Sequence, residues 1–229
     1  MGLIHGLGAD GATWDPFIDR MLATGLYTAT TVDLRGHGAS ERASSYALQD
    51  LADDIVESLP GGLHSVVGHS LGGAVLVRAV GRLKPQHAIY LDPGFGLSLP
   101  TTGLAGRAFW AVPAVTLGVA AIRQGRRSAS QRAVYPPEIQ AAVRRGQESF
   151  DSKMAIGVFR EVAFHPVPIS RPDAPSTIVL SDESPAVLPD AMAADLESAG
   201  WRIRRLGGMH HDMHLEDAER TFAAISDVL

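Results

Sequence analysis

The sequence contains no cysteine among its 229 residues. Disulfide bonds, a thiolate nucleophile and metal sites with cysteine ligands are therefore excluded. An excess of positive charge is also lacking, because 25 acidic residues outnumber 20 lysines and arginines and give a formal net charge of -5. Proteins that bind nucleic acid normally present a basic face, so we expect no nucleic acid among the partners.

Long hydrophobic runs are missing as well. The most apolar window, residues 108–122, is shorter than a membrane span and contains Pro113. We expect it to form a buried or cap helix. The first residues show neither the basic region nor the long apolar region of a signal peptide. These features predict a cytoplasmic protein with no membrane partner.

What is present is a regular alternation of short apolar runs with longer amphipathic runs. This pattern is typical of a parallel sheet covered by helices on both faces. The predicted strands are 2–5, 29–33, 65–68, 87–92, 177–181 and 202–206, and the predicted helices are 14–22, 48–59, 71–83, 189–199 and 215–228. Hydrophobic residues make up 45% of the chain, which is enough for one sizeable core. We expect a single domain over residues 1–229 of the α/β class, with a doubly wound, mostly parallel sheet of about six strands.

One region, residues 95–170, breaks the alternation. It contains three helical runs, near 103–124, 137–150 and 152–164, and no convincing strand. Open α/β sheets bind ligands outside the carboxyl ends of their strands, so we expect this insertion to form a helical cap there. The apolar residues expected to wall the pocket are Phe95, Leu97, Leu99, Leu104, Phe109, Trp110, Val158 and Phe159. They favour a small-molecule substrate with a mostly apolar acyl or ring group.

A serine between glycines follows the third predicted strand, in GHSLGG at residues 68–73. The pattern G-x-S-x-G has a mechanical reason: a sharp turn from strand to helix strains the backbone of the serine, and glycines remove side chains that would collide. The turn exposes the Ser70 hydroxyl. It also aims the backbone N–H of Leu71 at any oxyanion that forms on a substrate.

Taken together, four motifs resemble those of α/β-hydrolase fold serine hydrolases, in particular esterases and lactonases. The motifs are HGLG at 5–8, DLRGHGAS at 33–40, GHSLGG at 68–73 and HHDMHLE at 210–216. They occur in the family's order and at similar separations. The resemblance implies that the N–H of Leu7 is the second oxyanion donor. It assigns the loop 33–40 a structural role, and we give Asp33 no catalytic one.

The resemblance also concerns the first strand. The chain starts at the strand that carries His5, without the two earlier strands that usually form the family's first hairpin. A shorter sheet would expose an edge, which a homodimer would cover.

A serine hydroxyl is a weak nucleophile until a base takes its proton, and three late histidines are candidates for that base. The resemblance places the catalytic base at His211 and makes His214 the second histidine, while His210 occupies a position that is usually glycine. The run HHDMH also suggests a zinc site of His210, Asp212 and His214. Three ligands within one loop do not complete such a site, so we expect neither a metal nor another cofactor.

The acid of the triad stays open between two positions. Family members usually carry it after the penultimate strand, as glycine, two residues, then aspartate. In this register Ser181 replaces the glycine and Ser184 replaces the aspartate. A shifted loop would use Asp182 or Glu183, whereas some relatives draw the acid from the end of the strand after the nucleophile helix, where Asp92 lies. An aspartate before a Pro-Gly pair is also typical of a turn. We choose Asp92, with Asp182 as the alternative.

With Ser70, His211 and a carboxylate, the expected reaction is hydrolysis of a carboxylic ester or lactone through an acyl-enzyme, without a cofactor. A serine nucleophile argues against epoxide hydrolysis and dehalogenation, which use a carboxylate. Two other functions stay open. The same fold supports lyase, perhydrolase or cyclase chemistry, and it also supports a non-catalytic ligand receptor.

Overall fold

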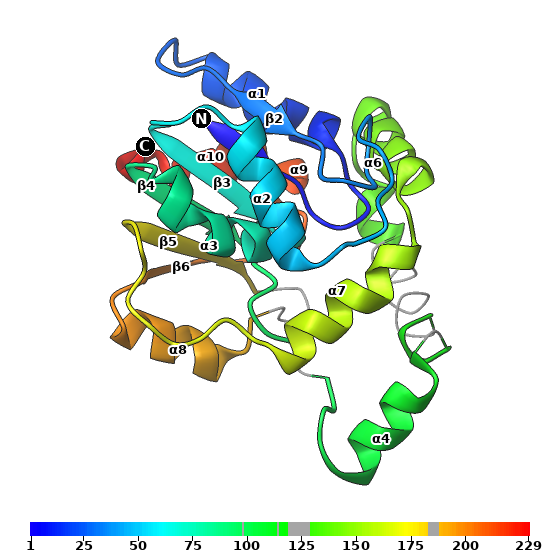
Figure 1. Cartoon of the computed structure of the whole chain (residues 1–229). Helices are drawn as coiled ribbons and strands as arrows, with labels where there is room; N and C mark the ends of the chain where they lie inside the picture. The colour runs from blue at the N-terminus through cyan, green and yellow to red at the C-terminus, as the bar shows by residue number, and fades with distance from the viewer. Residues whose placement is uncertain (98, 114, 119–128, 183–187) are drawn as a thin grey trace.

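Six strands form one sheet in the order β2-β1-β3-β4-β5-β6, and every neighbouring pair is parallel (Figure 1). The structure is a computed structural model that describes residues 1–97, 99–113, 115–118, 129–182 and 188–229. The strands are β1 (Gly2–Ile4), β2 (Thr30–Val32), β3 (Ser65–His69), β4 (His87–Leu91), β5 (Ser176–Ser181) and β6 (Arg202–Leu206). The predicted fold class, a doubly wound α/β sheet of six strands, is confirmed. No described strand precedes β1, as expected.

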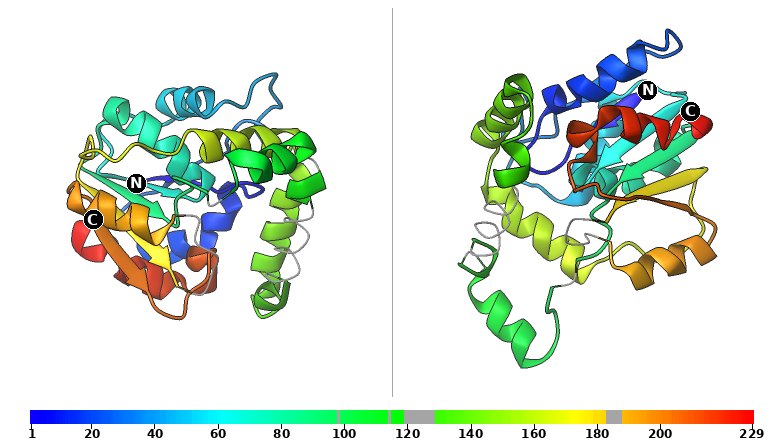
Figure 2. Two further views of the ribbon diagram at one scale, coloured as in Figure 1. Left: turned by 90° about the horizontal axis from the view of Figure 1, so that it is seen from below. Right: turned by 180° about the vertical axis from the view of Figure 1, so that it is seen from behind.

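Helices cover both faces of this sheet (Figure 2). The short 3-10 helices are η1 (Gly11–Trp14) and η2 (Ser226–Val228). The α-helices are α1 (Asp15–Leu22), α2 (Leu48–Ser58), α3 (Leu71–Leu83), α4 (Gly103–Ala111), α6 (Pro137–Ser149), α7 (Lys153–Phe164), α8 (Asp190–Ser198), α9 (Met213–Glu216) and α10 (Ala218–Ala223). None of the helices in the described part of the chain is long and apolar enough to cross a membrane.

Alternation along each strand divides the core between the two faces. Ile4 and Ile178 belong to a cluster with α2, α3, α7 and α8, whereas their neighbours Leu3 and Val179 belong to a cluster with α1 and α10. This arrangement follows from the two-residue period of a strand, which turns successive side chains to opposite faces. The inner strands β1, β3, β4 and β5 are therefore buried along nearly their whole length, whereas the edge strands β2 and β6 are largely exposed or half-buried.

Between β4 and β5 the chain forms α4, α6 and α7, which Figure 1 shows together beyond one end of the sheet. Helix α6 lies over the turn after β1, because a Cβ atom on Gly146 would be 3.0 Å from both Ala9 Cα and Gly8 O. The predicted helix 103–124 begins at the expected residue, but it is interrupted early, since α4 ends at Ala111. A proline disfavours the helical conformation of the residue before it, and Val112 has φ -135° and ψ 63°, which explains this end. Residues 114 and 119–124 of that prediction lie outside the described residues.

The predicted single helix 215–228 is wrong. The chain forms α9, α10 and η2 there, with a break at Asp217 (φ -150°, ψ 87°). The Asp217 side chain accepts a hydrogen bond from the N–H of Arg220 at 2.9 Å and so caps α10. Aspartate favours such a cap over a helix interior, and the periodic apolar pattern hid this competition.

The turn from β3 to α3 packs tightly against β1. A Cβ atom on Gly72 would overlap the carbonyl oxygen of Ile4, and one on Gly68 would lie 2.5 Å from the carbonyl oxygen of Gly72. Both obstacles are backbone atoms, so they cannot move aside as a side chain would.

We expect Gly72→Ala to lower the free energy of unfolding by about 1–3 kcal/mol or more, because the added methyl group separates α3 from β1. The matched control is Gly61→Ala, at an exposed position with no atom within 4 Å of the added Cβ. This control should change the free energy by less than about 0.5 kcal/mol. Urea unfolding followed by circular dichroism measures both, and equal stabilities would refute the close packing.

Candidate active site

Ser70 lies at the turn between β3 and α3 in a left-handed conformation, with φ 51° and ψ -112°. Its N–H donates to the carbonyl of Leu91 at 3.0 Å, and its carbonyl accepts from the N–H groups of Gly73 (3.1 Å) and Gly94 (2.9 Å). These bonds hold a conformation that a serine rarely adopts. Leu71 is the first residue of α3, so its N–H is one of the donors that a helix start leaves without a partner in the helix.

A cavity of about 130 Å³ lies beside this turn. Its lining includes Ser70 and His211, together with Leu7 from the turn after β1 and Val143 from α6. The structure therefore brings together the predicted nucleophile, the predicted base and one predicted oxyanion residue, which lie far apart in the sequence.

None of the eight apolar residues expected to wall the pocket lines this cavity. Phe95 and Val158 are buried in the core, and Leu104 is 83% exposed. Composition showed that the insertion is apolar, but the direction of each side chain depends on how its helix packs.

Asp92 is the carboxylate that contacts His211. It follows β4 with φ 40°, is buried, and has one oxygen, Oδ2, 3.2 Å from His211 Nδ1. Ser181 at the end of β5 holds it from the other side: the Ser181 N–H donates to Oδ1 at 2.7 Å and the Ser181 hydroxyl donates to Oδ2. Sequence reasoning noticed Ser181 only as a departure from the family pattern.

The alternative acid, Asp182, is directed elsewhere. It is exposed, and its Oδ1 accepts hydrogen bonds from the N–H groups of Gly208 (2.7 Å) and Met209 (3.3 Å). This carboxylate thus ties the end of β5 to the turn after β6. Glu183 and Ser184 lie outside the described residues.

The three late histidines have different surroundings. His210 Nδ1 lies 2.9 Å from Glu216 Oε1, and His214 is buried against the rings of Trp14 and His69 at centroid distances of 4.4 and 4.6 Å. Of the three, His211 is the one whose ring contacts Asp92. Burial opposes the charged form of this imidazole, but the hydrogen bond to Asp92 and the nearby carboxylate charges raise the pKa of His211 above its ordinary value.

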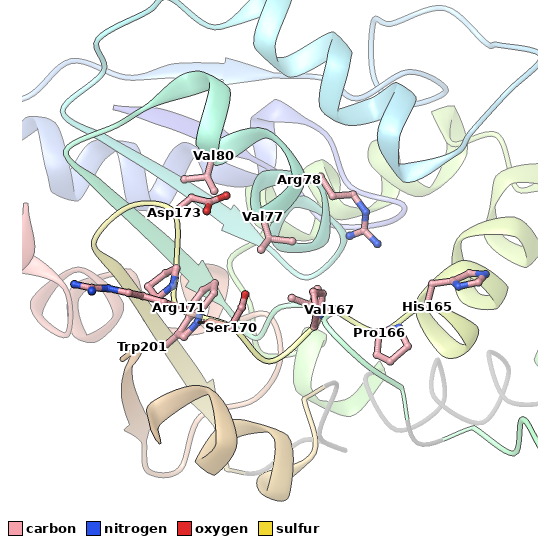
Figure 3. Close-up of a pocket in the computed structure, with 12 residues that line it drawn as sticks. Val77, Arg78, Val80, His165, Pro166, Val167, Ser170, Arg171, Asp173 and Trp201 are labelled. Atoms are coloured by element: carbon pink, nitrogen blue, oxygen red, sulfur yellow. Dashed lines mark hydrogen bonds between the residues drawn. The ribbon is translucent and has the colours of Figure 1, made fainter. Parts of the chain in front are cut away.

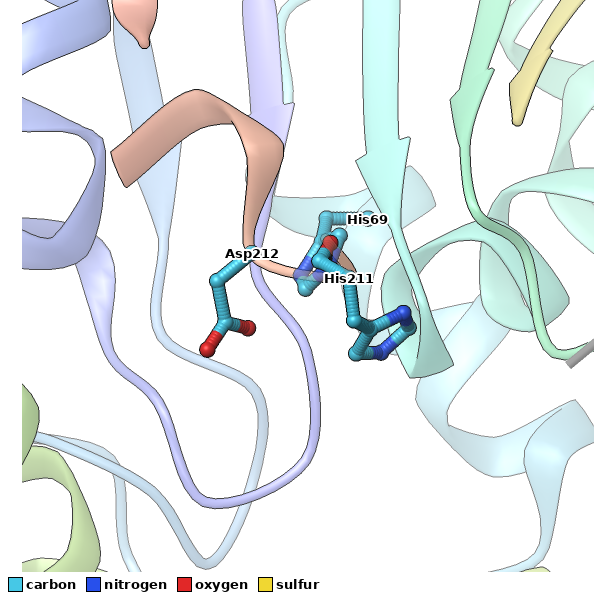
Figure 4. Close-up of side chains that lie close together, drawn as sticks. All are labelled: His69, His211 and Asp212. Atoms are coloured by element: carbon cyan, nitrogen blue, oxygen red, sulfur yellow. Dashed lines mark hydrogen bonds between the residues drawn. The ribbon is translucent and has the colours of Figure 1, made fainter. Parts of the chain in front are cut away.

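Sequence reasoning missed His69, the variable residue of the G-x-S-x-G motif. Its Nε2–H donates to the carbonyl of His211 at 2.9 Å, which links the nucleophile turn to the histidine loop. Ligand atoms of His69, His211 and Asp212 lie within 4.8 Å of one another (Figure 4). Two imidazoles and a carboxylate suit a transition metal. However, Arg132 pairs with Asp212 at 3.0 Å, so a cation there would have to displace a positive charge.

The turn after β1 lies directly on the serine turn. A Cβ atom on Gly6 would be 2.9 Å from His69 Nδ1 and 3.2 Å from Ser70 Cβ. Glycine at this position lets the backbone of Leu7 approach the nucleophile.

A larger cavity, of about 360 Å³, lies on the other side of α3, against residues 165–173 and Trp201 (Figure 3). Neither Ser70 nor His211 lines it. Its two arginines, Arg78 and Arg171, point to opposite sides, so they do not converge on one ligand.

Residues 3–225, nearly the whole chain, match the model of the Alpha/beta hydrolase family. The chain belongs to this family.

Among individual relatives, a pimeloyl-[acyl-carrier protein] methyl ester esterase of Methylococcus capsulatus is 36% identical over 83 residues, which are 36% of this chain. The match spans 31% of that relative's length. Two solved α/β-hydrolase structures resemble the whole chain. An N-acyl homoserine lactone degrading enzyme has a TM-score of 0.74 and 21% identity, covering 100% of this chain and 93% of the other. An N-formylmaleamic acid deformylase from Pseudomonas putida S16 has a TM-score of 0.71 and 20% identity, covering 98% and 90%. At this identity they show the fold alone.

The contact between Asp92 and His211 predicts a titration. We expect His211 to titrate above the ordinary histidine value of 6.5, and Asp92→Asn to lower its pKa because the carboxylate charge is lost. Asp182→Asn is the matched control, since that carboxylate bonds to backbone N–H groups instead, and it should leave the pKa of His211 unchanged. NMR titration of the imidazole signals measures all three proteins. A shift in the Asp182 variant alone would contradict the prediction.

Proposed function

We propose that the protein is a serine hydrolase that cleaves a carboxylic ester or lactone through an acyl-enzyme intermediate. The observation that carries the proposal is the contact of His211 with the buried Asp92, together with the cavity that His211 and Ser70 both line. The family supplies the coarser frame, and the esterase relative supports the ester as substrate class.

In this mechanism Ser70 Oγ attacks the carbonyl carbon, and its proton passes to His211 Nε2. Asp92 keeps the other ring nitrogen protonated and stabilises the imidazolium. His211 then gives the proton to the leaving alcohol as the carbon–oxygen bond breaks. A water molecule attacks the acyl-enzyme, its proton passes through His211 to Ser70 Oγ, and the acid leaves.

The negative charge on the carbonyl oxygen would be met by the N–H groups of Leu7 and Leu71. Both are backbone donors held by rigid elements, so they need no reorganisation when the charge develops. Ser70 follows β3 and Leu7 follows the neighbouring β1, so the two proposed donors come from adjacent turns at the same edge of the sheet.

The size and lining of the cavity limit the substrate. A volume of about 130 Å³ admits a short acyl group, and Leu7, Val143 and Leu215 offer it an apolar wall. We propose an ester or lactone whose acyl side is small and apolar.

A fluorophosphonate probe tests the nucleophile. We expect the wild-type protein to react with one equivalent, because Ser70 Oγ attacks the phosphorus as it would attack a carbonyl, and Ser70→Ala not to react. Intact-protein mass spectrometry measures the adduct. A folded wild-type protein that stays unlabelled would favour the ligand-receptor alternative.

Steady-state kinetics on short-chain p-nitrophenyl esters and lactones test the acid. We expect Asp92→Asn to lower kcat by about 10⁴-fold, because the imidazole loses its orienting partner, and Asp182→Asn by less than about threefold. A larger loss of kcat in Asp182→Asn than in Asp92→Asn would assign the role of the triad acid to Asp182. Labelling without turnover on any ester or lactone would favour lyase, perhydrolase or cyclase chemistry.

A further inference from the structure

The loop of residues 33–40, between β2 and α2, lies behind the turn that follows β1. Two side chains of this loop accept hydrogen bonds from backbone N–H groups of that turn. The Gly11 N–H donates to Asp33 Oδ1 at 2.7 Å, and the Gly8 N–H donates to His37 Nε2 at 3.1 Å. The loop has no side chain in the cavity that Ser70 lines, so the proposed mechanism gives it no role.

His37 is buried between two rings, with centroids 4.9 Å from His5 and 5.0 Å from Phe150 at the end of α6. Because Nε2 accepts the Gly8 N–H, the ring proton resides on Nδ1, which lies 3.3 Å from the carbonyl of Arg35. Burial lowers the pKa of His37 to about 4, so the neutral ring with its acceptor is the form present at neutral pH.

His5 makes a matching arrangement on the other side of Leu7. Its Nε2 accepts the N–H of Leu34 at 3.0 Å, so its Nδ1–H donates to the carbonyl of Gly6 at 2.8 Å. In a planar trans peptide the carbonyl of Gly6 and the N–H of Leu7 point in opposite directions. Holding the carbonyl therefore orients that N–H. The Gly8 N–H belongs to the next peptide plane, which is the one that His37 holds.

We propose that His37 is a positioning residue for the oxyanion hole. It holds the Leu7–Gly8 peptide plane, which follows Leu7, while His5 holds the Gly6–Leu7 plane, which carries the Leu7 N–H. With the planes on both sides of Leu7 fixed, its N–H stays directed at the substrate carbonyl oxygen. This inference rests on the proposed function of Leu7. His37 does not line the cavity and acts through the backbone. Gly8 has φ 72°, a conformation that glycine leaves easily once its N–H has no acceptor. When an oxyanion donor turns away, the transition state loses more stabilisation than the bound substrate does, because the negative charge develops only in the transition state.

Three variants of His37 distinguish the effect of losing the hydrogen-bond acceptor for the Gly8 N–H from the effect of losing the bulk of the ring. The Oε1 of His37→Gln stands as many bonds from Cβ as Nε2 does, whereas His37→Asn is too short to reach Gly8 and His37→Leu has no acceptor. We expect the Asn and Leu variants to lower kcat by about 10- to 100-fold with KM within about threefold, and the Gln variant to stay within about fivefold of wild type.

The matched control is Ser149→Ala, which removes the acceptor of the Gly38 N–H (3.2 Å) in the same loop and should leave kcat unchanged. Active-site titration with the fluorophosphonate counts only folded enzyme. If the Leu variant does not fold, the comparison of Asn with Gln decides.

Amide hydrogen exchange at Gly8, followed by NMR, measures how well the hydrogen bond from the Gly8 N–H to residue 37 protects this amide, and it needs no substrate. Faster exchange in the Asn variant than in the Gln variant, together with the loss of kcat, supports the role. Unchanged kcat in the Asn variant, or a Gln variant as slow as Asn, overturns it. A wild-type protein that neither reacts with fluorophosphonate nor cleaves any ester overturns the proposed function instead, which keeps the two failures distinct.

Discussion

The left-handed bend at Ser70 is the constraint on which the rest of this site depends. A non-glycine residue in that conformation costs about 1–3 kcal/mol, so the surrounding structure must hold it. The hydrogen bonds of the Ser70 N–H to the Leu91 carbonyl and of the Gly94 N–H to the Ser70 carbonyl do so from one side. On the other side, Gly72 lets the backbone of α3 touch that of β1, and Gly68 lets the end of β3 touch the start of α3. Close packing thus fixes the direction of one side chain.

Strand order explains why the groups of the site meet there. From β1 the chain moves to β2 on one side, and from β3 it moves to β4 on the other, so β1 and β3 flank the point where the winding reverses. Loops diverge at such a point and leave a crevice outside the carboxyl ends of the strands. Leu7 follows β1 and Ser70 follows β3, while α6 covers the crevice through the contact of Gly146 with Gly8.

The carboxylate beside His211 comes from β4, one strand nearer to the serine than the family's usual position. Strands β4 and β5 are neighbours, with Leu91 paired to Val179, so the residue after β4 lies beside the end of β5. Ser181 uses this closeness to donate both its N–H and its hydroxyl to Asp92. Ser181, which stands where the family pattern has glycine, therefore holds the carboxylate of Asp92 on the adjacent strand.

Residues alone were enough to infer the six strands and the turn at Ser70, because periodicity and tight turns are local properties. The choice of His211 among the late histidines rested on the family resemblance instead. The helix break at Asp217 escaped, since a side-chain cap competes there with an apolar pattern. Only the folded chain shows that Asp92 rather than Asp182 contacts His211, brings His69 to His211, and keeps the eight apolar residues expected to wall the pocket out of the cavity. These outcomes depend on contacts between residues far apart in the chain, whose distances and directions are set by how the strands and helices pack.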